Sequence, residues 1–423
     1  MVLVANHSLR DKILFTLKLI AIQRIGVFIP IPGINYNLFA FNNYNINGYA
    51  SVDKISNFID VFTGGSLSSL GIFSLGIVPY INATIIIQIL VKSIPKLDKI
   101  QKEDGEIGKK YIKQLTRYLS LFLSILQSII FTLWLKPYFN EWNFLYVIHT
   151  VTILSTSSIF IMWLSEQMTS YGIGNGSSII VFINIISGIL NLFFKLPLVI
   201  NELKNITNII ICFVLLFFII LGVMLLQEGM RKIPIISVKQ LSQLENIDKI
   251  HYLPFKLNQS GVMPIIFASS FSGLPIYLMN LLSKSSLFAS RYVFINSEIF
   301  NFITISFNFL LILFFGYFYI SMILNPDELS NNLRKMSVMV PGVKPGSYTK
   351  IFLKETLFRL TIIGSTFLAF IAILPIVVQS LTGFLILKSF ATTSILIVIG
   401  VAIDIIRQLK NYSIISLYEA MLS

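Results

Sequence analysis

Residues 73–90 read FSLGIVPYINATIIIQIL and contain no charged side chain. The hydrocarbon core of a bilayer is about 30 Å thick, and a helix needs roughly 20 apolar residues to cross it. The run continues with few polar interruptions over about 70–91, so it predicts a membrane span. Pro79 lies within this run, and proline is tolerated in the first turn of a helix, where its missing N–H would be unpaired anyway.

Nine further runs of this kind give ten expected spans. They lie at about 12–32, 70–91, 113–136, 144–165, 176–196, 206–227, 261–283, 301–324, 357–377 and 389–408. The 423 residues are 55% hydrophobic and 12% charged, whereas an average soluble domain is about 45–50% apolar and about 25% charged. The mean hydropathy is +0.81. This composition excludes an ordinary soluble enzyme and predicts an all-α, multi-pass membrane protein.

The basic residues set the expected orientation, because Lys and Arg favour the cytoplasmic side of a membrane. With ten spans both termini lie on one side, and 24 of the 32 Lys and Arg fall on that side, against 7 on the other. We therefore expect both termini on the cytoplasmic or stromal side. The inner loops near 92–112, 228–260 and 325–356 are the long polar ones, which suggests a partner there. The alternative is that these loops are simply solvated and only set topology.

A short repeat divides the ten spans into two fives. Gly76-Ile77-Val78-Pro79-Tyr80-Ile81 begins the second span, and Gly261-Val262-Met263-Pro264-Ile265-Ile266 begins the seventh. Five is odd, so equivalent spans run in opposite directions, which predicts an inverted repeat with the working site between the halves. The expected halves are residues 1–200 and 201–423. Proline in a first helical turn is common by itself, so the match alone does not prove a repeat.

The segment from Asn57 to Gly71 is rich in Gly and Ser and half apolar. It is too short and too polar to span a membrane, and too apolar for a free loop. Irregular backbone at membrane depth must be shielded from lipid by protein. The segment therefore predicts a re-entrant element, with an ordinary interfacial helix as the alternative.

Ionisable side chains within the expected spans are few, and Arg24 and Asp404 are the clear cases. A charge inside a membrane indicates function by default, and Arg24 needs a carbonyl or an acid as its partner. Residues 172–176, GIGNG, follow an apolar span and predict a tight turn between helices. No phosphate-binding loop, zinc-binding motif or catalytic pair is present, and the sequence predicts neither an enzyme nor a metal site.

Six motifs in order along the chain resemble SecY, the channel subunit of the general protein translocase. They are Ile29-Pro30-Ile31-Pro32-Gly33-Ile34, the run from Phe73 to Leu90, Gly172-Ile173-Gly174-Asn175-Gly176-Ser177, Gly261-Val262-Met263-Pro264 with Phe267-Ala268-Ser269-Ser270, Asn325-Pro326 with Asn332-Leu333, and Val340-Pro341-Gly342-Val343-Lys344-Pro345-Gly346. Residues 227–234, QEGMRKIP, are similar to the branch found in cyanobacteria and plastids.

The resemblance implies an hourglass pore between two five-helix halves, closed by a plug helix, with a lateral gate into lipid. Carried over by motif, the pore ring would comprise Ile77, Ile81, Ser177, Val181, Ile266 and Ile397, where Ser177 replaces an expected isoleucine-like residue. The plug would cover about residues 57–70, including Phe58, Phe62, Gly64 and Gly65. The polar positions of the gate would be Asn82, Gln127 and Asn258.

The resemblance also implies partners and no cofactor. SecE-type and SecG-type subunits, the SecA motor ATPase, a ribosome or the signal recognition pathway, signal sequences and membrane lipid would contact the channel. Docking would use the loops 228–260 and 325–356, through Arg231, Lys232, Arg334, Lys335 and Lys344. Lys344 stands where bacterial relatives have Arg, and residues 241–245, LSQLE, lack the basic cluster expected at a loop tip.

The sequence leaves two questions open, namely the class of transport protein and the membrane in which it lies. An inverted repeat alone would also fit an ion-coupled secondary transporter, although the midplane candidates here are Ile, Val and Ser and not charged groups. The abundance of Ile, Asn, Lys, Phe and Tyr suggests an AT-rich genome, which favours a plastid thylakoid membrane over the plasma membrane of an AT-rich bacterium.

Overall fold

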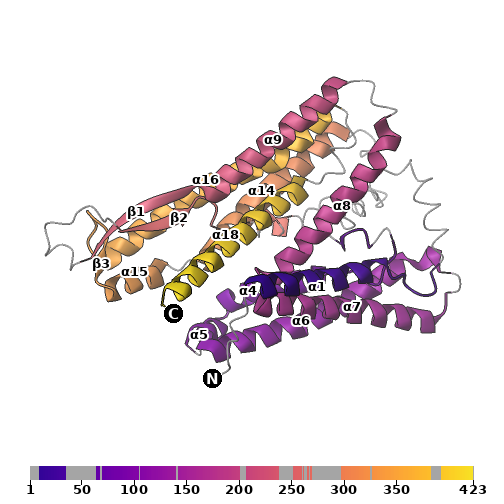
Figure 1. The fold of residues 1–423 in the computed structure, drawn as a ribbon, viewed down its shortest axis with the longest axis horizontal. Helices are drawn as coiled ribbons and strands as arrows, with labels where there is room; N and C mark the ends of the chain where they lie inside the picture. Colours follow the sequence, from indigo (N-terminus) through magenta and orange to yellow (C-terminus); the bar gives the residue numbers. More distant parts are fainter. Residues whose placement is uncertain are drawn as a thin grey trace, which may run out of the picture. The chain divides into compact units, whose positions relative to one another are not determined.

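The computed structural model describes residues 9–34, 63–66, 69–103, 105–139, 142–200, 206–237, 251–259, 261, 264–265, 267–268, 297–323, 326–382 and 392–422. The fold is mostly helical, as predicted (Figure 1). The chain forms two compact units, one of Met1–Lys204 with Val401–Ser423 and the other of Asn205–Gly400. The predicted halves, divided at residue 200, stay a prediction.

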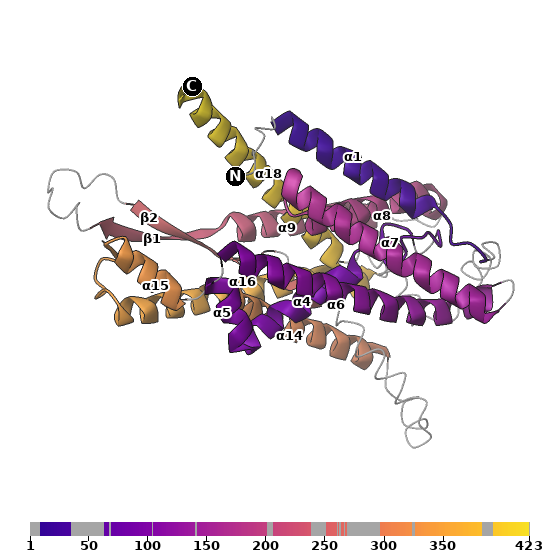
Figure 2. The same cartoon turned by 90° about the horizontal axis from the view of Figure 1, so that it is seen from below.

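The first unit contains six α-helices and a short 3-10 helix in its described residues. They are α1 (Leu9–Phe28), α4 (Val78–Ser93), α5 (Pro95–Glu103), α6 (Gly105–Trp134), η1 (Lys136–Tyr138), α7 (Phe144–Tyr171) and α8 (Gly176–Ile200). Helices α4, α6 and α7 pack side by side in sequence order (Figures 1 and 2). Residues 172–175 form the turn between α7 and α8, which confirms the expectation for this glycine-rich stretch.

The second unit contains helices α9 (Ile206–Glu228), α14 (Ser297–Ile323), α15 (Pro326–Lys335) and α16 (Ser347–Thr382). The strands are β1 (Met230–Ser237), β2 (His251–Lys256) and β3 (Val338–Met339). The last helix, α18 (Thr392–Leu422), begins in the second unit and continues into the first from Val401.

Among the described residues, four helices are long and apolar enough to cross a membrane. They are α6, α7, the part of α14 from Ile305 onward, and the part of α16 over Ser347–Leu374. Helices α4 and α5 together would make a fifth span if counted as one bent element. The multi-pass helical fold is therefore supported, and the count of ten spans stays a prediction.

The bend between α4 and α5 has a local cause. Ile94 is extended (φ −106°, ψ 108°) and precedes Pro95, whose ring disfavours a helical conformation in the preceding residue. Helix α4 therefore ends at Ser93, and residues 95–101 leave at an angle of 105°. Helix α5, which carries Lys96 and Lys99, therefore leaves the axis of the apolar helix.

The interface of α6 with α7 is built on small hydroxyl side chains. Every fourth residue of α6 is a buried Ser or Thr, namely Thr116, Ser120, Ser124, Ser128 and Thr132. Small residues let helices approach closely where lipid provides no hydrophobic driving force for association. The hydroxyls bond to backbone carbonyls of their own helix or across the interface, as when Ser120 Oγ donates to Met162 Sδ at 3.0 Å.

Two of the three loops expected on the inner side, 228–260 and 325–356, were not predicted to pair, yet they share one antiparallel sheet in the order β2-β1-β3. Ile233 pairs with Leu253 and Ile236 with Met339. Alternate residues of a strand face one side, so Ile233 and Ile235 both contact an apolar core. Its buried members are Ile233, Phe255, Leu333, Val340, Leu353, Leu357 and Leu360. We call β1, β2, β3, α15 and the first turns of α16 the inner module, after the expected location of its loops (Figure 1).

Replacing Leu353 with Ala will loosen the inner module. The side chain is 0% exposed, and truncating a buried Leu costs about 2–5 kcal/mol because a cavity remains. Amide hydrogen exchange in β1 and β2 will therefore be faster in L353A. Ile351→Ala is the matched control, since Ile351 lies on the same helix and is 54% exposed. Equal exchange in L353A and I351A would show that this core does not hold the module together.

Candidate functional site

The two Gly-x-x-Pro motifs adopt the same backbone conformation at their first residue. Gly76 has φ +55° and Gly261 has φ +62°, both in the left-handed region that favours glycine. Pro79 lies in the first turn of α4, and Pro264 and Ile265 are also helical. In both units a glycine in the left-handed region is thus followed three residues later by a helical proline. The two motifs are alike in backbone conformation as well as in sequence at these positions, and the inverted repeat stays a prediction.

The predicted ring residues lie at or near helix ends. Ile77 is the N-cap residue of α4 and is 1% exposed, and Ile81 is half-buried one turn later. Val181 in α8 and Ile397 in α18 are also buried, and Ser177 is half-buried. Ile266 lies outside the described residues.

Ser177 has a hydrogen-bond partner in its own turn. Asn175 Oδ1 accepts from the Ser177 N–H at 3.2 Å and from the Ser177 Oγ at 2.8 Å. An Asn side chain that accepts from an early N–H is a typical helix N-cap. The hydroxyl is therefore directed toward the start of α8.

The described part of the predicted plug segment is buried and hydrogen-bonded. Thr63, Ser66 and Leu70 are at most 2% exposed. Ser66 Oγ donates to the Phe73 carbonyl at 2.8 Å, and the Gly71 N–H donates to the Ser66 carbonyl at 2.8 Å. The segment also forms a bridge with residues after α1, between Pro30 and Gly71. Phe58 and Phe62 lie outside the described residues, and the predicted plug helix stays a prediction.

Such hydrogen bonding is what a re-entrant element would need, and the re-entrant element itself stays a prediction. Unsatisfied backbone groups cost several kcal/mol in hydrocarbon, because no water can replace the missing bond. Here side-chain hydroxyls satisfy irregular backbone, which explains why the segment is rich in Ser. Gly64 and Gly65 both have positive φ, +72° and +86°, so the chain turns sharply there.

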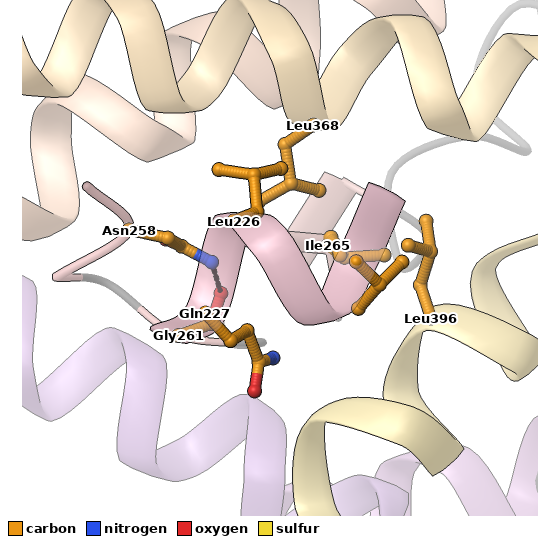
Figure 3. Close-up of a pocket in the computed structure, with 8 residues that line it drawn as sticks. Leu226, Gln227, Asn258, Gly261, Ile265, Leu368 and Leu396 are labelled. Carbon is orange, nitrogen blue, oxygen red and sulfur yellow. Dashed lines mark hydrogen bonds between the residues drawn. The ribbon is translucent and has the colours of Figure 1, made fainter. Parts of the chain in front are cut away.

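The predicted gate residues have different surroundings. Asn82 in α4 and Gln127 in α6 are half-buried. Asn258 is buried and donates its Nδ2 to the Gly261 carbonyl at 2.8 Å (Figure 3). This bond joins residues 258 and 261, which lie between β2 and the helical residues Pro264 and Ile265.

Asn258 lines a small cavity in the second unit, shown in Figure 3. The cavity is lined by Val223, Leu226, Gln227, Asn258, Gly261, Ile265, Leu368 and Leu396. Six of these are apolar or glycine, so the Asn258 and Gln227 amides are its polar side chains. The two amides therefore line the same small cavity as Gly261, the first residue of the second Gly-x-x-Pro motif.

The predicted docking residues are all exposed on the inner module. Arg231 and Lys232 lie on β1, Arg334 and Lys335 in the last turn of α15, and Lys344 in the turn before α16. Lys232 Nζ lies 4.9 Å from the centroid of the Tyr252 ring. Cations in a last helical turn are favourable beside the negative end of the helix dipole. The module thus holds basic groups from both loops on one folded body.

The two charged residues predicted within spans, Arg24 and Asp404, differ in burial. Arg24 is half-buried and bonds to a backbone carbonyl, that of Gly64, which was one of its two expected partners. Asp404 is exposed on α18.

A buried glutamate was missed. Glu166 in α7 is 6% exposed and accepts two hydrogen bonds from one edge of the Arg117 guanidinium, from Nε to Oε1 at 3.0 Å and from Nη2 to Oε2. Lys113 Nζ lies 3.3 Å from Glu166 Oε2. The predicted span ended at residue 165, one position short of Glu166, and Lys113 and Arg117 were counted only as inner charges. A lone acid directly after an apolar run, with two bases at the start of the preceding span, is the signal that would have identified the pair.

No group of three or more His, Cys, Asp or Glu side chains that could hold a metal ion occurs in the part of the chain that the structure describes.

Comparison with known proteins gives concordant results. The SecY family profile matches residues 71–406. The protein translocase subunit SecY of Guillardia theta is 44% identical over 99% of this chain and 98% of its own length. That of Porphyra purpurea is 42% identical over 98% and 99%, and that of Synechococcus elongatus 41% over 98% and 94%.

Solved structures share the fold at low sequence identity. A protein-conducting channel superposes with a TM-score of 0.69 at 16% identity, covering 99% of this chain and 96% of its own. Sec61 in a canine ribosome–channel complex gives a TM-score of 0.67 at 17% identity, with the same coverage.

The Glu166 cluster predicts an asymmetry between two substitutions. Arg117→Met removes both bonds from the guanidinium and leaves the buried carboxylate with Lys113 alone, and removing one partner of a buried ion pair costs on the order of 3 kcal/mol. Glu166→Gln lets Arg117 and Lys113, each 47% exposed, return to water, and we expect a cost of about 1 kcal/mol. Thermal unfolding of the purified protein will show the larger decrease in Tm for R117M. A larger decrease for E166Q would contradict this interpretation.

Proposed function

The chain belongs to the SecY family, and we infer that it is the pore-forming subunit of a protein translocase. Unfolded preproteins cross a membrane through such a channel, and hydrophobic segments leave it sideways into lipid. The observation that carries this inference is the SecY profile match over residues 71–406, together with relatives at 41–44% identity along nearly the whole chain. The protein is a channel subunit and not an enzyme. Nothing in the comparisons supports an ion-coupled transporter.

We propose ten spans in two inverted five-helix halves, residues 1–200 and 201–423. The shared left-handed glycine and the following proline at residues 76–79 and 261–264 support this repeat. The excess of 24 over 7 basic residues supports termini on the cytoplasmic or stromal side.

For the pore, we propose that Ile77, Ile81, Ser177, Val181, Ile266 and Ile397 form a ring. Branched apolar side chains can seal against ions by excluding water. They also offer no specific bond that would retain a polypeptide sliding past. Because the Ser177 hydroxyl bonds to Asn175 at the start of its helix, its polarity is already satisfied by the turn.

For closing and opening, we propose a plug over about residues 57–70 and a gate that uses Asn82, Gln127 and Asn258. Hydrogen bonds between helices in membranes are worth only about 0.6–2 kcal/mol each. A signal sequence entering the gate could therefore replace them at low cost.

We propose the inner module as the docking surface for a SecA-type motor or a ribosome. Its apolar core holds Arg231, Lys232, Arg334, Lys335 and Lys344 on one body. Phosphate contacts by Lys and Arg would bind ribosomal RNA, and acidic protein surfaces would meet the same charges. A relative in fold, Sec61, has been solved on a ribosome, which supports this assignment. SecE-type and SecG-type subunits and the signal recognition pathway complete the proposed partners.

The relatives come from plastids of algae and from cyanobacteria, and the protein is a membrane channel of this group. We propose the thylakoid membrane of a plastid as its location.

The function is tested by crosslinking to a translocating chain. A photoreactive residue at position 81 in the complete channel complex will form an adduct with the hydrophilic part of a stalled secretory precursor. Position 122 is the control, because Phe122 is 59% exposed on α6 and should not meet that part of the precursor. Absence of an adduct at 81, together with saturable uptake of a small solute, would support the transporter instead.

The assignment of the pore ring is tested by measuring the resting ion conductance of the channel. Replacing Ile77 and Ile397 with Ser together will raise the resting ion conductance of the reconstituted channel several-fold, because hydroxyls admit water to a dewetted constriction. Ile86→Ser on α4 is the matched control, since Ile86 is 37% exposed, and we expect no change in conductance. If I77S/I397S also leaves conductance unchanged, the ring assignment is wrong.

A further inference from the structure

Arg24 carries a charge into an apolar helix, and neither the pore ring nor the gate uses it. It lies in α1 and is half-buried. Its Nη1 donates to the carbonyl of Gly64 at 3.3 Å, and its Nη2 donates to Ser187 Oγ on α8. Among the residues that the structure describes, Arg24 makes no ion pair. One guanidinium therefore joins the turn at Gly64 to two helices.

A second bond runs beside the first. Gln23 Nε2 donates to Asn184 Oδ1 at 2.7 Å, and both side chains are 1% exposed. Asn184 lies one helical turn before Ser187, so Gln23 and Arg24 of α1 bind successive polar residues of α8. Buried polar side chains in a membrane helix are costly unless paired. The pairing therefore fixes α1 against α8 at the height of Gly64.

Gly64 fits this site because it has no side chain. A Cβ on Gly64 would lie 2.7 Å from Arg24 Nη1 and 2.7 Å from Asn184 Oδ1, closer than side-chain contacts allow. The residue also has φ +72°, which other residues rarely adopt. The backbone of the turn is thus in direct contact with the polar groups of both helices.

We propose that Arg24 is a positioning residue that latches the re-entrant segment, by holding the Gly64 turn to α1 and α8 in the resting channel. Three observations converge on it, namely the bond from Arg24 to a backbone carbonyl, the parallel bond from Gln23 to Asn184, and the absence of room for a side chain at Gly64. The two bonds of the guanidinium are both to neutral groups, so they can break without leaving an unpaired acid. The inference rests on the proposed channel function.

The latch predicts a protected residue at position 63. Thr63 is 1% exposed and directly precedes Gly64. The chain has one cysteine, Cys212, so T63C in a C212A background provides a single reporter thiol. In the complete reconstituted complex, a membrane-impermeant maleimide will modify this thiol slowly. Adding R24M, which keeps a long side chain but removes all donors, will raise the rate at least about fivefold.

Two variants separate a latch from general loss of structure. Lys18→Met removes a charge from the exposed side of the same helix, and labelling at position 63 will not change. Ser187→Ala removes one of the two acceptors and will give an intermediate rate, while R24M/S187A will label no faster than R24M. Should R24M fail to assemble, the comparison of S187A with K18M carries the test.

Resting ion conductance and preprotein translocation are measured on the same complexes. We expect R24M to conduct several-fold more than the parent while still translocating. Unchanged labelling and conductance with translocation intact would overturn the latch and leave the channel function standing. Failure of the unmutated complex to translocate would instead overturn the proposed function.

Discussion

The constraint on which this structure depends is that polar backbone away from water must find its partner within the protein. Regular helices meet it internally, whereas residues 63–66 and 69–74 in the described part of the chain meet it by other bonds. There Ser66 and Ser74 bond to carbonyls of the stretch itself, and Ser69 bonds to the Val27 carbonyl of α1. Arg24 satisfies the Gly64 carbonyl. A non-helical segment can persist here because hydroxyls and one cation replace the missing water.

The same constraint explains where charge is tolerated within the helices. Glu166 is buried, and its two basic partners, Lys113 and Arg117 of α6, are each about half exposed. Arg24 is half-buried with neutral partners. The first arrangement adds an ion pair between two helices, α6 and α7, that already pack along a line of small hydroxyl side chains. The second joins helices to an irregular turn, which is a contact that can be exchanged.

The sequence determined the membrane class, the helical fold and the family. Long apolar runs and few charges leave no other way to satisfy the backbone, so 73–90 and its counterparts could be assigned without coordinates. The Gly-x-x-Pro motifs and the turn at 172–176 were also readable, because glycine and proline restrict the backbone locally. Exposure of Lys344 and its basic neighbours followed from their charge alone.

Only the tertiary structure decided which distant residues meet. The apolar residues of β1, β2 and α15 looked like scattered members of polar loops, and their shared core depends on strand register and helix packing between segments about one hundred residues apart. The partners of Arg24 and Glu166 were likewise hidden, since Ser187 and Arg117 are ordinary residues of other helices. The backbone conformation of a short segment depends on neighbouring residues in the sequence, whereas pairing between helices depends on the geometry of the folded chain.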